Sequence, residues 1–207
     1  MRRPIAVVFD VGKVLYDWSP RFLYERLIDD DRALEAFLRD VVTPEWHFQH
    51  DAGRPFAETS AELIARFPEH EALISVWGPT FLNSIGEPIA GMHALVEELD
   101  TAGVPLYAIT NFSGEFWPPF RAREAALFDR FRDVVVSGDE KLVKPDAAIY
   151  RLALGRFGLE PHEAVFIDDN RDNVTGAEAV GMAAIHFTGA DALRRELVEL
   201  GLPVRQP

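Results

Sequence analysis

Cysteine is absent from this 207-residue chain. Its absence excludes disulfides, thiolate metal sites and cysteine nucleophiles. Long hydrophobic runs are absent too, since no stretch reaches the roughly 18 apolar residues that span a membrane. The first apolar run, at residues 5–9, is shorter than the ~7–15 residues of a signal-peptide core. We therefore expect a soluble, cytoplasmic protein with no membrane partner.

Positive charge is scarce. Only 21 Lys and Arg stand against 34 Asp and Glu, which gives a formal net charge of −13. A surface of this sign repels nucleic-acid phosphates, so we expect no nucleic-acid partner. An anionic substrate would need a local positive site. Apolar residues still make up 48% of the chain, which is enough for a packed core and too much for a disordered protein.

Five short apolar segments have the composition of strands buried on both faces. They are residues 5–9, 104–109, 133–136, 164–167 and 183–187. Helical patterns lie between the later segments, and one of them opens with Pro145 at a plausible first helical position. The alternation of strand and helix favours an α/β fold built on a Rossmann-like open parallel sheet.

One interval breaks this alternation. About eighty residues separate the first strand from the helix at Met92, and they show helical apolar stripes at 34–42, 63–67 and 73–77 without a convincing strand. A compact domain does not hold a bare loop of this length. We predict an all-helical subdomain at residues 17–88, inserted into an α/β core formed by residues 1–16 and 89–207.

Polar side chains follow the predicted strands at the edge where open parallel sheets bind ligands. They are Asp10 after the first strand, Thr110 and Asn111 after the second, Lys141 and Lys144 after the third, and Asp168, Asp169 and Asn170 after the fourth. Taken singly, each is typical of a turn or a helix cap. Together they predict one site with three carboxylates, a hydroxyl, an amide and at least one lysine.

Three carboxylates within ~4 Å repel by several kcal/mol per pair at an effective dielectric near 20. The cluster therefore needs a cation or a proton. An all-oxygen ligand set suggests a hard ion, Mg²⁺ before Ca²⁺ or Mn²⁺. With Lys144, such an ion would make a positive pocket for phosphate in an acidic protein.

Four segments, taken in order, resemble the four motifs of the haloacid dehalogenase-like hydrolase superfamily. They read VVFDVGKVLYDW, YAITNFS, VKPDAAIYRLAL and AVFIDDNRDNVTGAEAVGM. The resemblance covers roughly residues 4–16 and 89–190, and the helical insert occupies the position of the family's cap. It implies a hydrolase that forms a covalent intermediate on an aspartate.

The resemblance also assigns roles to residues. Asp10 matches the nucleophile that becomes an aspartyl-phosphate, and Lys144 balances charge on nucleophile and phosphate. Thr110 and the Asn111 backbone match the motif that holds phosphoryl oxygens. The implied Mg²⁺ ligands are Asp10, the Gly12 carbonyl, Asp168 and Asp169, with Asn173 in support. Mg²⁺ and the lysine would stabilise the transferring phosphoryl group.

The first motif departs from the common phosphatase pattern. Most phosphatases of the superfamily carry a second acid two residues after the nucleophile, and here that residue is Gly12, with Val14 two positions later. The chain resembles the subgroup with an Asp-x-Gly-x-Val motif. We predict a Mg²⁺-dependent phosphatase of a small phosphorylated metabolite, with a sugar phosphate as one candidate. His47, His50 and Asp51 in the cap are candidates for the missing proton donor.

Two alternatives stay open. In a 2-haloacid dehalogenase Asp10 would attack carbon without a metal, but such enzymes typically lack the acids found at Asp168 and Asp169. In a catalytically weak, ligand-binding family member, Gly12 would be the defect and Lys13 could pair with Asp10. We favour a solvent-facing Lys13. The aromatic residues Trp18, Trp46, Phe116, Trp117 and Phe120 are expected between cap and core, and residues 16–20 and 84–90 are the expected hinges.

Overall fold

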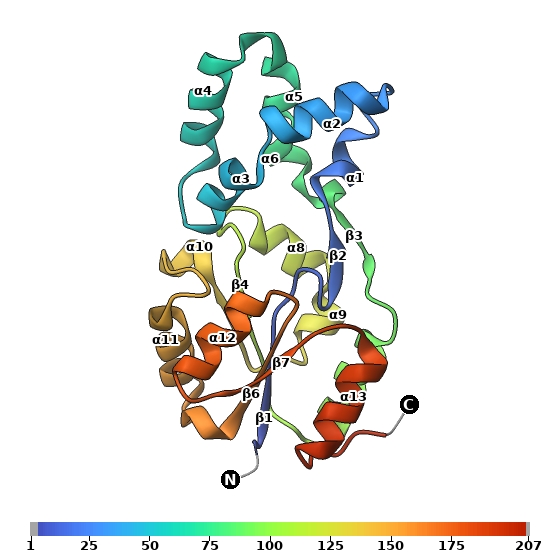
Figure 1. The fold of residues 1–207 in the computed structure, drawn as a ribbon, viewed down its shortest axis with the longest axis vertical. Coiled ribbons are helices and arrows are strands. Elements are labelled where there is room, and N and C mark those ends of the chain that lie inside the picture. Colours follow the sequence, from blue (N-terminus) through green and yellow to red (C-terminus); the bar gives the residue numbers. More distant parts are fainter. Residues whose placement is uncertain (1–3, 206–207) are drawn as a thin grey trace.

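A five-stranded parallel sheet forms the centre of the protein, which we describe from a computed structural model covering residues 4–205. The strand order is β5-β4-β1-β6-β7 (Figure 1). The strands are β1 (Ala6–Phe9), β4 (Leu106–Thr110), β5 (Asp133–Val136), β6 (Ala164–Asp168) and β7 (Ala183–His186). The predicted α/β fold with a Rossmann-like open parallel sheet is confirmed.

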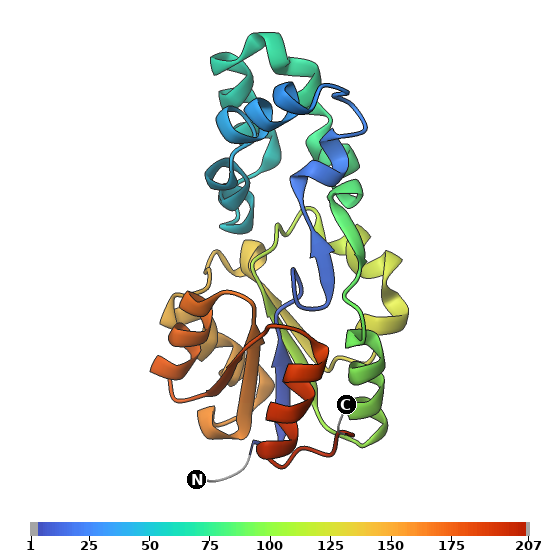
Figure 2. The same ribbon diagram turned by 45° about the vertical axis from the view of Figure 1, so that its right-hand side comes forward.

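Helices cover both faces of this sheet, as its apolar strands require. On one face lie α7 (Met92–Thr101) and α13 (Ala190–Glu199), and on the other α11 (Ala147–Phe157) and α12 (Arg171–Ala179) (Figures 1 and 2). Every residue of β1, β4 and β6 is buried. Strand β1 pairs with β4 and β6, so the chain leaves all three strands at the same edge.

Helix α11 begins later than predicted. Pro145 does not open it, because the helix starts at Ala147 with Asp146 as its N-cap. The reason is long-range: the Asn111 side chain bonds both the N–H and the C=O of Lys144, which fixes the preceding residues in a turn. A local pattern cannot show this contact.

The interval between β1 and α7 contains two short strands that we did not predict. They are β2 (Tyr16–Trp18) and β3 (Ile85–Pro88), which pair antiparallel as a ribbon. Their pairing joins segments almost seventy residues apart (16–18 with 85–88), and three or four residues are too few to show an alternating pattern. The prediction of no strand in this interval was wrong at its two ends.

Between these strands the chain is helical, and we call residues 20–84 the cap. Its elements are α1 (Pro20–Tyr24), α2 (Asp31–Asp40), α3 (Pro44–Asp51), α4 (Phe56–Arg66), η1 (Pro68–His70), α5 (Glu71–Ser75), α6 (Trp77–Thr80) and η2 (Phe81–Ser84). Figure 2 shows the cap beyond the sheet edge, joined to it by the β2–β3 ribbon. The division into an insert at 17–88 and a core at 1–16 and 89–207 stays a prediction.

The remaining elements are α8 (Trp117–Arg123), α9 (Ala125–Phe128), α10 (Ser137–Glu140) and η3 (Pro161–Glu163). Among residues 4–205, no helix combines the length and the apolar character needed to cross a membrane.

The cap contacts the core directly where α3 ends. The Ser137 hydroxyl donates to the Asp51 carbonyl at 2.6 Å, and the Phe56 N–H donates to the Glu115 carboxylate at 3.0 Å. Gly53 has φ +87°, and a Cβ there would lie 2.7 Å from the Gly138 carbonyl oxygen. A glycine therefore allows the cap backbone to approach the core this closely.

Candidate active site

A buried lysine joins two strand ends. Lys144 Nζ lies 2.8 Å from Asp10 Oδ1 and 2.6 Å from Asp168 Oδ2. All three side chains are almost completely buried. Removing one charge from such a group leaves the others uncompensated, which makes the arrangement strongly interdependent. The structure thus brings together three residues that the strand-end pattern singled out.

Backbone and amide contacts fix the nucleophile candidate and its lysine. The Val11 N–H donates to Asp10 Oδ1 at 2.7 Å, so Oδ1 holds two donors and Oδ2 is left clear of both. The Asn111 amide accepts from the Lys144 N–H at 2.9 Å and donates to the Lys144 carbonyl at 3.1 Å. Asn111 therefore braces Lys144 through its side chain. Its predicted backbone contact to phosphate stays a prediction.

Asp168 and Asp169 are adjacent but have different surroundings. Asp168 accepts from the Asn170 N–H at 2.8 Å and from the Asn173 amide at 3.1 and 3.0 Å, in addition to Lys144. Asp169 is exposed and forms no ion pair within residues 4–205. We infer that Asp168 mainly orients the lysine, whereas Asp169 is open to a ligand. Asn170 caps α12.

The charges of the site are unbalanced. Burial raises the pKa of Asp10 to about 7, although Lys144 opposes this. Although Asp169 is exposed as a residue, partial desolvation of its carboxyl group and the charge of Asp168 raise the pKa of Asp169, while Lys144 lowers it. Burial disfavours the charged form of Lys144, but Asp10 and Asp168 more than offset this and hold the pKa of Lys144 above its usual value. One lysine cannot balance three carboxylates, so the site would attract a further cation.

These residues fit a divalent metal ion. Asp10, Asp168 and Asp169 each offer a carboxylate oxygen, and these oxygens all lie within 4.8 Å of one another. A ligand set made only of carboxylate oxygens suits Mg²⁺. Gly12, whose carbonyl is the fourth predicted ligand, follows Asp10 by two residues and lines the adjoining cavity.

Other predicted residues have simple locations. Thr110 is the last residue of β4 and is buried at the sheet edge. Lys13 pairs with Asp17 at 2.6 Å on the surface, which confirms that it faces solvent and does not pair with Asp10. Lys141 is exposed at the end of α10, and the structure does not bring it into the acid cluster.

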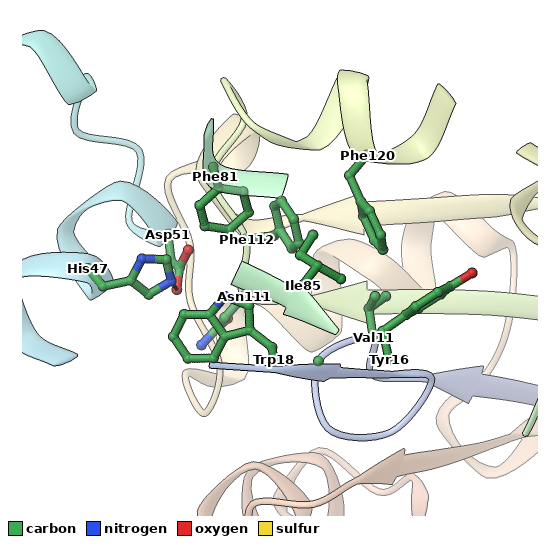
Figure 3. A pocket seen from close by; sticks show the side chains of 11 residues that line it. Val11, Tyr16, Trp18, His47, Asp51, Phe81, Ile85, Asn111, Phe112 and Phe120 are labelled. Carbon is green, nitrogen blue, oxygen red and sulfur yellow. Dashed lines mark ion pairs between the residues drawn. The ribbon is translucent and has the colours of Figure 1, made fainter. Parts of the chain in front are cut away.

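An apolar cavity lies between cap and core, and the two residues that follow Asp10 contribute to its lining (Figure 3). Its lining comprises Val11, Gly12, Tyr16, Trp18, His47, Asp51, Phe81, Ile85, Asn111, Phe112 and Phe120. Of the aromatic residues expected between cap and core, Trp18 and Phe120 line the cavity. Phe116 also lies between cap and core, because its ring stacks on Phe81 of the cap at 4.6 Å. Trp46 packs on Trp77 within the cap, and Trp117 packs on Phe120 within the core.

Helix α3 carries three buried polar side chains, His47, His50 and Asp51, of which His47 and Asp51 line this cavity. The ring of His47 stacks between Trp18 and Phe81, with centroid distances of 4.7 and 5.9 Å. His47 Nε2 lies 3.5 Å from Asp51 Oδ2, and His50 Nε2 lies 2.6 Å from the Thr59 hydroxyl. Burial lowers the pKa of His47 to about 3 and that of His50 to about 4.

Ser137 is a site residue that the sequence analysis missed. It is fully buried directly after β5, accepts from the Phe112 N–H at 2.9 Å and donates to the Asp51 carbonyl. It follows the predicted strand at 133–136, so the rule that found Asp10 and Asp168 also applied to it. A single serine after a strand gave no chemical reason to select it.

Comparison with known proteins agrees with this geometry. Residues 6–181 match the haloacid dehalogenase-like hydrolase family. The chain is 28% identical to the sesquiterpene phosphatase astK of Aspergillus oryzae, over 94% of this chain and 95% of that protein. It is 30% identical to the phosphoglycolate phosphatase of Pectobacterium atrosepticum, over 65% of this chain and 54% of that protein.

A solved structure shows the same fold. It is a haloacid dehalogenase family enzyme of Bacteroides thetaiotaomicron in complex with magnesium and inorganic phosphate, with a TM-score of 0.65 and 17% identity over 90% of this chain and 95% of that one. The fold, the clustered acids and the family match define the protein as a hydrolase with a Rossmann-like α/β core. The chain belongs to the haloacid dehalogenase-like hydrolase family.

Proposed function

We propose that this protein is a Mg²⁺-dependent phosphatase that hydrolyses a small phosphorylated metabolite through an aspartyl-phosphate on Asp10. The observation that carries the proposal is the arrangement of Asp10. Its Oδ1 is held by Lys144 and the Val11 N–H, Oδ2 takes part in neither contact, and the Asp168 and Asp169 carboxylates lie close by. A fixed nucleophile with one unengaged oxygen suits in-line attack on phosphorus.

Each residue has a defined part in this proposal. Lys144 offsets negative charge on Asp10 and on the phosphoryl group, while Thr110 and the Asn111 backbone contact phosphoryl oxygens. Asp10, Asp169, Asp168 and the Gly12 carbonyl would hold Mg²⁺, and the ion would supply Lewis-acid stabilisation of the phosphoryl charge. The phosphatase relatives and the magnesium and phosphate bound by the Bacteroides enzyme support this assignment.

The cavity supports an apolar organic group on the ester. Most of its lining is aromatic or aliphatic. The polar groups of Tyr16 and Trp18 already donate to Glu124 and Ser84, and the Asn111 amide braces Lys144, which leaves His47 and Asp51. A sugar, our candidate from the sequence, would need more hydrogen-bonding partners than this lining offers. The similarity to a sesquiterpene phosphatase over almost its whole length also favours an apolar group.

The two alternatives are less well supported. A 2-haloacid dehalogenase would attack carbon without a metal, whereas three clustered carboxylates favour a bound cation. A catalytically weak binding member would not require the nucleophile, lysine and acids to remain in one connected cluster, as they do here. A cytoplasmic location stays a prediction.

The decisive experiment assays phosphate esters and 2-chloropropionate, each with added Mg²⁺ and with EDTA. We expect phosphate release that requires Mg²⁺, and a loss of activity by orders of magnitude in Asp10→Asn with the fold retained. Halide release that persists in EDTA would favour the dehalogenase. An Asp10→Asn protein with near-wild-type turnover would refute the nucleophile assignment.

A further inference from the structure

The proposed reaction requires a proton for the departing alcohol, and the residues near Asp10 do not supply one. The position two residues after the nucleophile is Gly12. A Cβ added to Gly12 would meet no atom within 4 Å, so this wall of the site is open space. A proton donor must therefore come from another wall of the cavity.

Asp51 has the position for this task. It ends α3, is 6% exposed and lines the same cavity as Gly12 and Asn111. Among the residues that line the cavity it is the only one with a carboxyl group. Its Oδ1 is buried and has no hydrogen-bond partner within residues 4–205. Figure 3 shows its carboxyl group beside the His47 ring at the cap end of the cavity.

The core holds Asp51 in this place. The Ser137 hydroxyl donates to the Asp51 carbonyl at 2.6 Å, and Gly53 permits the backbone to approach Gly138 just beyond it. On the cap side, Trp18 and Phe81 fix the neighbouring His47 ring. The Asp51 backbone is thus held by a hydrogen bond between core and cap, and the neighbouring His47 ring is held by contacts within the cap and the ribbon.

We propose that Asp51 is the general acid and base of this reaction, supplied by the cap in place of a side chain at position 12; this role rests on the proposed phosphatase function. As Asp10 Oδ2 bonds to phosphorus, the ester P–O bond breaks and its electron pair goes to the alcohol oxygen, which takes the proton of Asp51. The products are the alcohol, phosphorylated Asp10 and an Asp51 carboxylate.

The second half-reaction restores both residues. The Asp51 carboxylate takes a proton from a water molecule as the water oxygen bonds to phosphorus. The bond between Asp10 and phosphorus then breaks, which releases inorganic phosphate, returns the Asp10 carboxylate and leaves Asp51 protonated. One residue thus serves as acid and then as base, and every proton is accounted for.

The electrostatics of the cap agree with this geometry. Burial, followed by the charge of Asp10, raises the pKa of Asp51 to about 8, although Lys144 opposes this, so the folded protein holds the proton at neutral pH. His47 and His50 have pKa values of about 3 and 4 and carry no extra proton there. Of the three cap candidates, only Asp51 therefore carries a proton at neutral pH that it can donate to the leaving group.

The test compares two esters in single-turnover measurements of alcohol release. The leaving group of 4-nitrophenyl phosphate departs without a proton, whereas that of benzyl phosphate requires one. For Asp51→Asn we expect alcohol release to slow by about 100-fold or more with benzyl phosphate and by less than about threefold with 4-nitrophenyl phosphate. The exposed cap residue Asp40 provides the matched control, and Asp40→Asn should change neither rate.

Equal losses on both esters, or no loss on either, would overturn the role of Asp51. If Asp51→Asn does not fold, the wild-type protein provides the test. With a general acid, its rates of alcohol release from the two esters should lie within about tenfold of each other. A rate on benzyl phosphate more than about 1000-fold below that on 4-nitrophenyl phosphate would overturn the inference. The failure of the proposed function looks different, because the wild-type enzyme would then release neither alcohol.

Discussion

One buried polar cluster lies in the core and a second lies in the cap, and the two are built differently. In the core, Asp10, Lys144 and Asp168 are joined by ion pairs and by amide and backbone donors. In the cap, His47, His50 and Asp51 leave His47 Nδ1, His50 Nδ1 and Asp51 Oδ1 without partners among the described residues. The core cluster is a charged, fixed framework, and the cap cluster is neutral and unsatisfied.

This difference assigns different tasks to the two regions. A charged cluster whose side chains are fixed by ion pairs and hydrogen bonds can hold phosphate and a cation with little rearrangement. A neutral, under-bonded carboxyl group costs stability when it is buried, which is a cost that a proton donor facing a substrate can explain. The leaving group of the substrate would lie in the cavity, where the cap could donate a proton to it while the core holds the phosphate.

The largest expected effect comes from breaking the core cluster. Lys144→Met removes the charge that compensates Asp10 and Asp168, so we expect a stability loss of about 3–5 kcal/mol and at least a 100-fold loss of turnover. Urea unfolding and the phosphate-ester assay measure the two. A variant as stable as the wild type would show that these buried acids do not depend on the lysine.

The cap cluster should respond to acid. His50 has a pKa of about 4 in the folded protein against 6.5 for an ordinary histidine, so below pH 6.5 the unfolded chain binds a proton that the folded one does not. His50 alone should therefore contribute a fall in stability of about 1.4 kcal/mol per pH unit between pH 6.5 and 4.

Unfolding of His50→Gln across this range measures the histidine's share, because the variant should lose that part of the slope. The neighbouring His47 and Arg54 remain in both proteins, as does Asp51, whose raised pKa acts in the opposite direction. The exposed His162 provides the control, since His162→Gln should retain the wild-type slope. An unchanged slope in His50→Gln would contradict the neutral, buried state of this residue.

Metal binding should stabilise the core. At a Mg²⁺ concentration 100 times its dissociation constant, we expect about 2.7 kcal/mol of added stability, reversed by EDTA. Asp169→Asn should lose most of this gain, whereas the exposed Asp172→Asn on the following helix should retain it. If both variants gained the same stability from Mg²⁺, Asp169 would not be a metal ligand.

The smallest effect tests the link between the two regions. Ser137→Ala leaves the Phe112 N–H without its acceptor and releases the Asp51 carbonyl, at a cost of about 1–3 kcal/mol in stability. Benzyl phosphate turnover should fall by less than about tenfold. The control is Ser60→Ala, because that buried hydroxyl bonds only to Ala57 within its own helix. A larger loss of turnover in Ser60→Ala than in Ser137→Ala would contradict the role of the Ser137 hydroxyl in joining cap and core.

Local patterns were sufficient for the framework of this protein. Buried apolar runs located all five sheet strands to within two residues at their ends. The rule for strand ends selected Asp10, Lys144 and Asp168 before any contact was known. The β2–β3 ribbon and the start of α11 were not predictable in this way, because both depend on partners far away in the sequence.

The sequence by itself determined the sheet, the family and the acids at its edge, because strand composition and motif order are local properties. Only the tertiary structure decided which cap side chains line the cavity and how apolar that cavity is. His47, His50 and Asp51 occupy one short helix and cannot be ranked from their spacing. The three residues can be ranked only from the burial and the contacts of each side chain, because burial and contacts set the pKa of the side chain and fix its orientation.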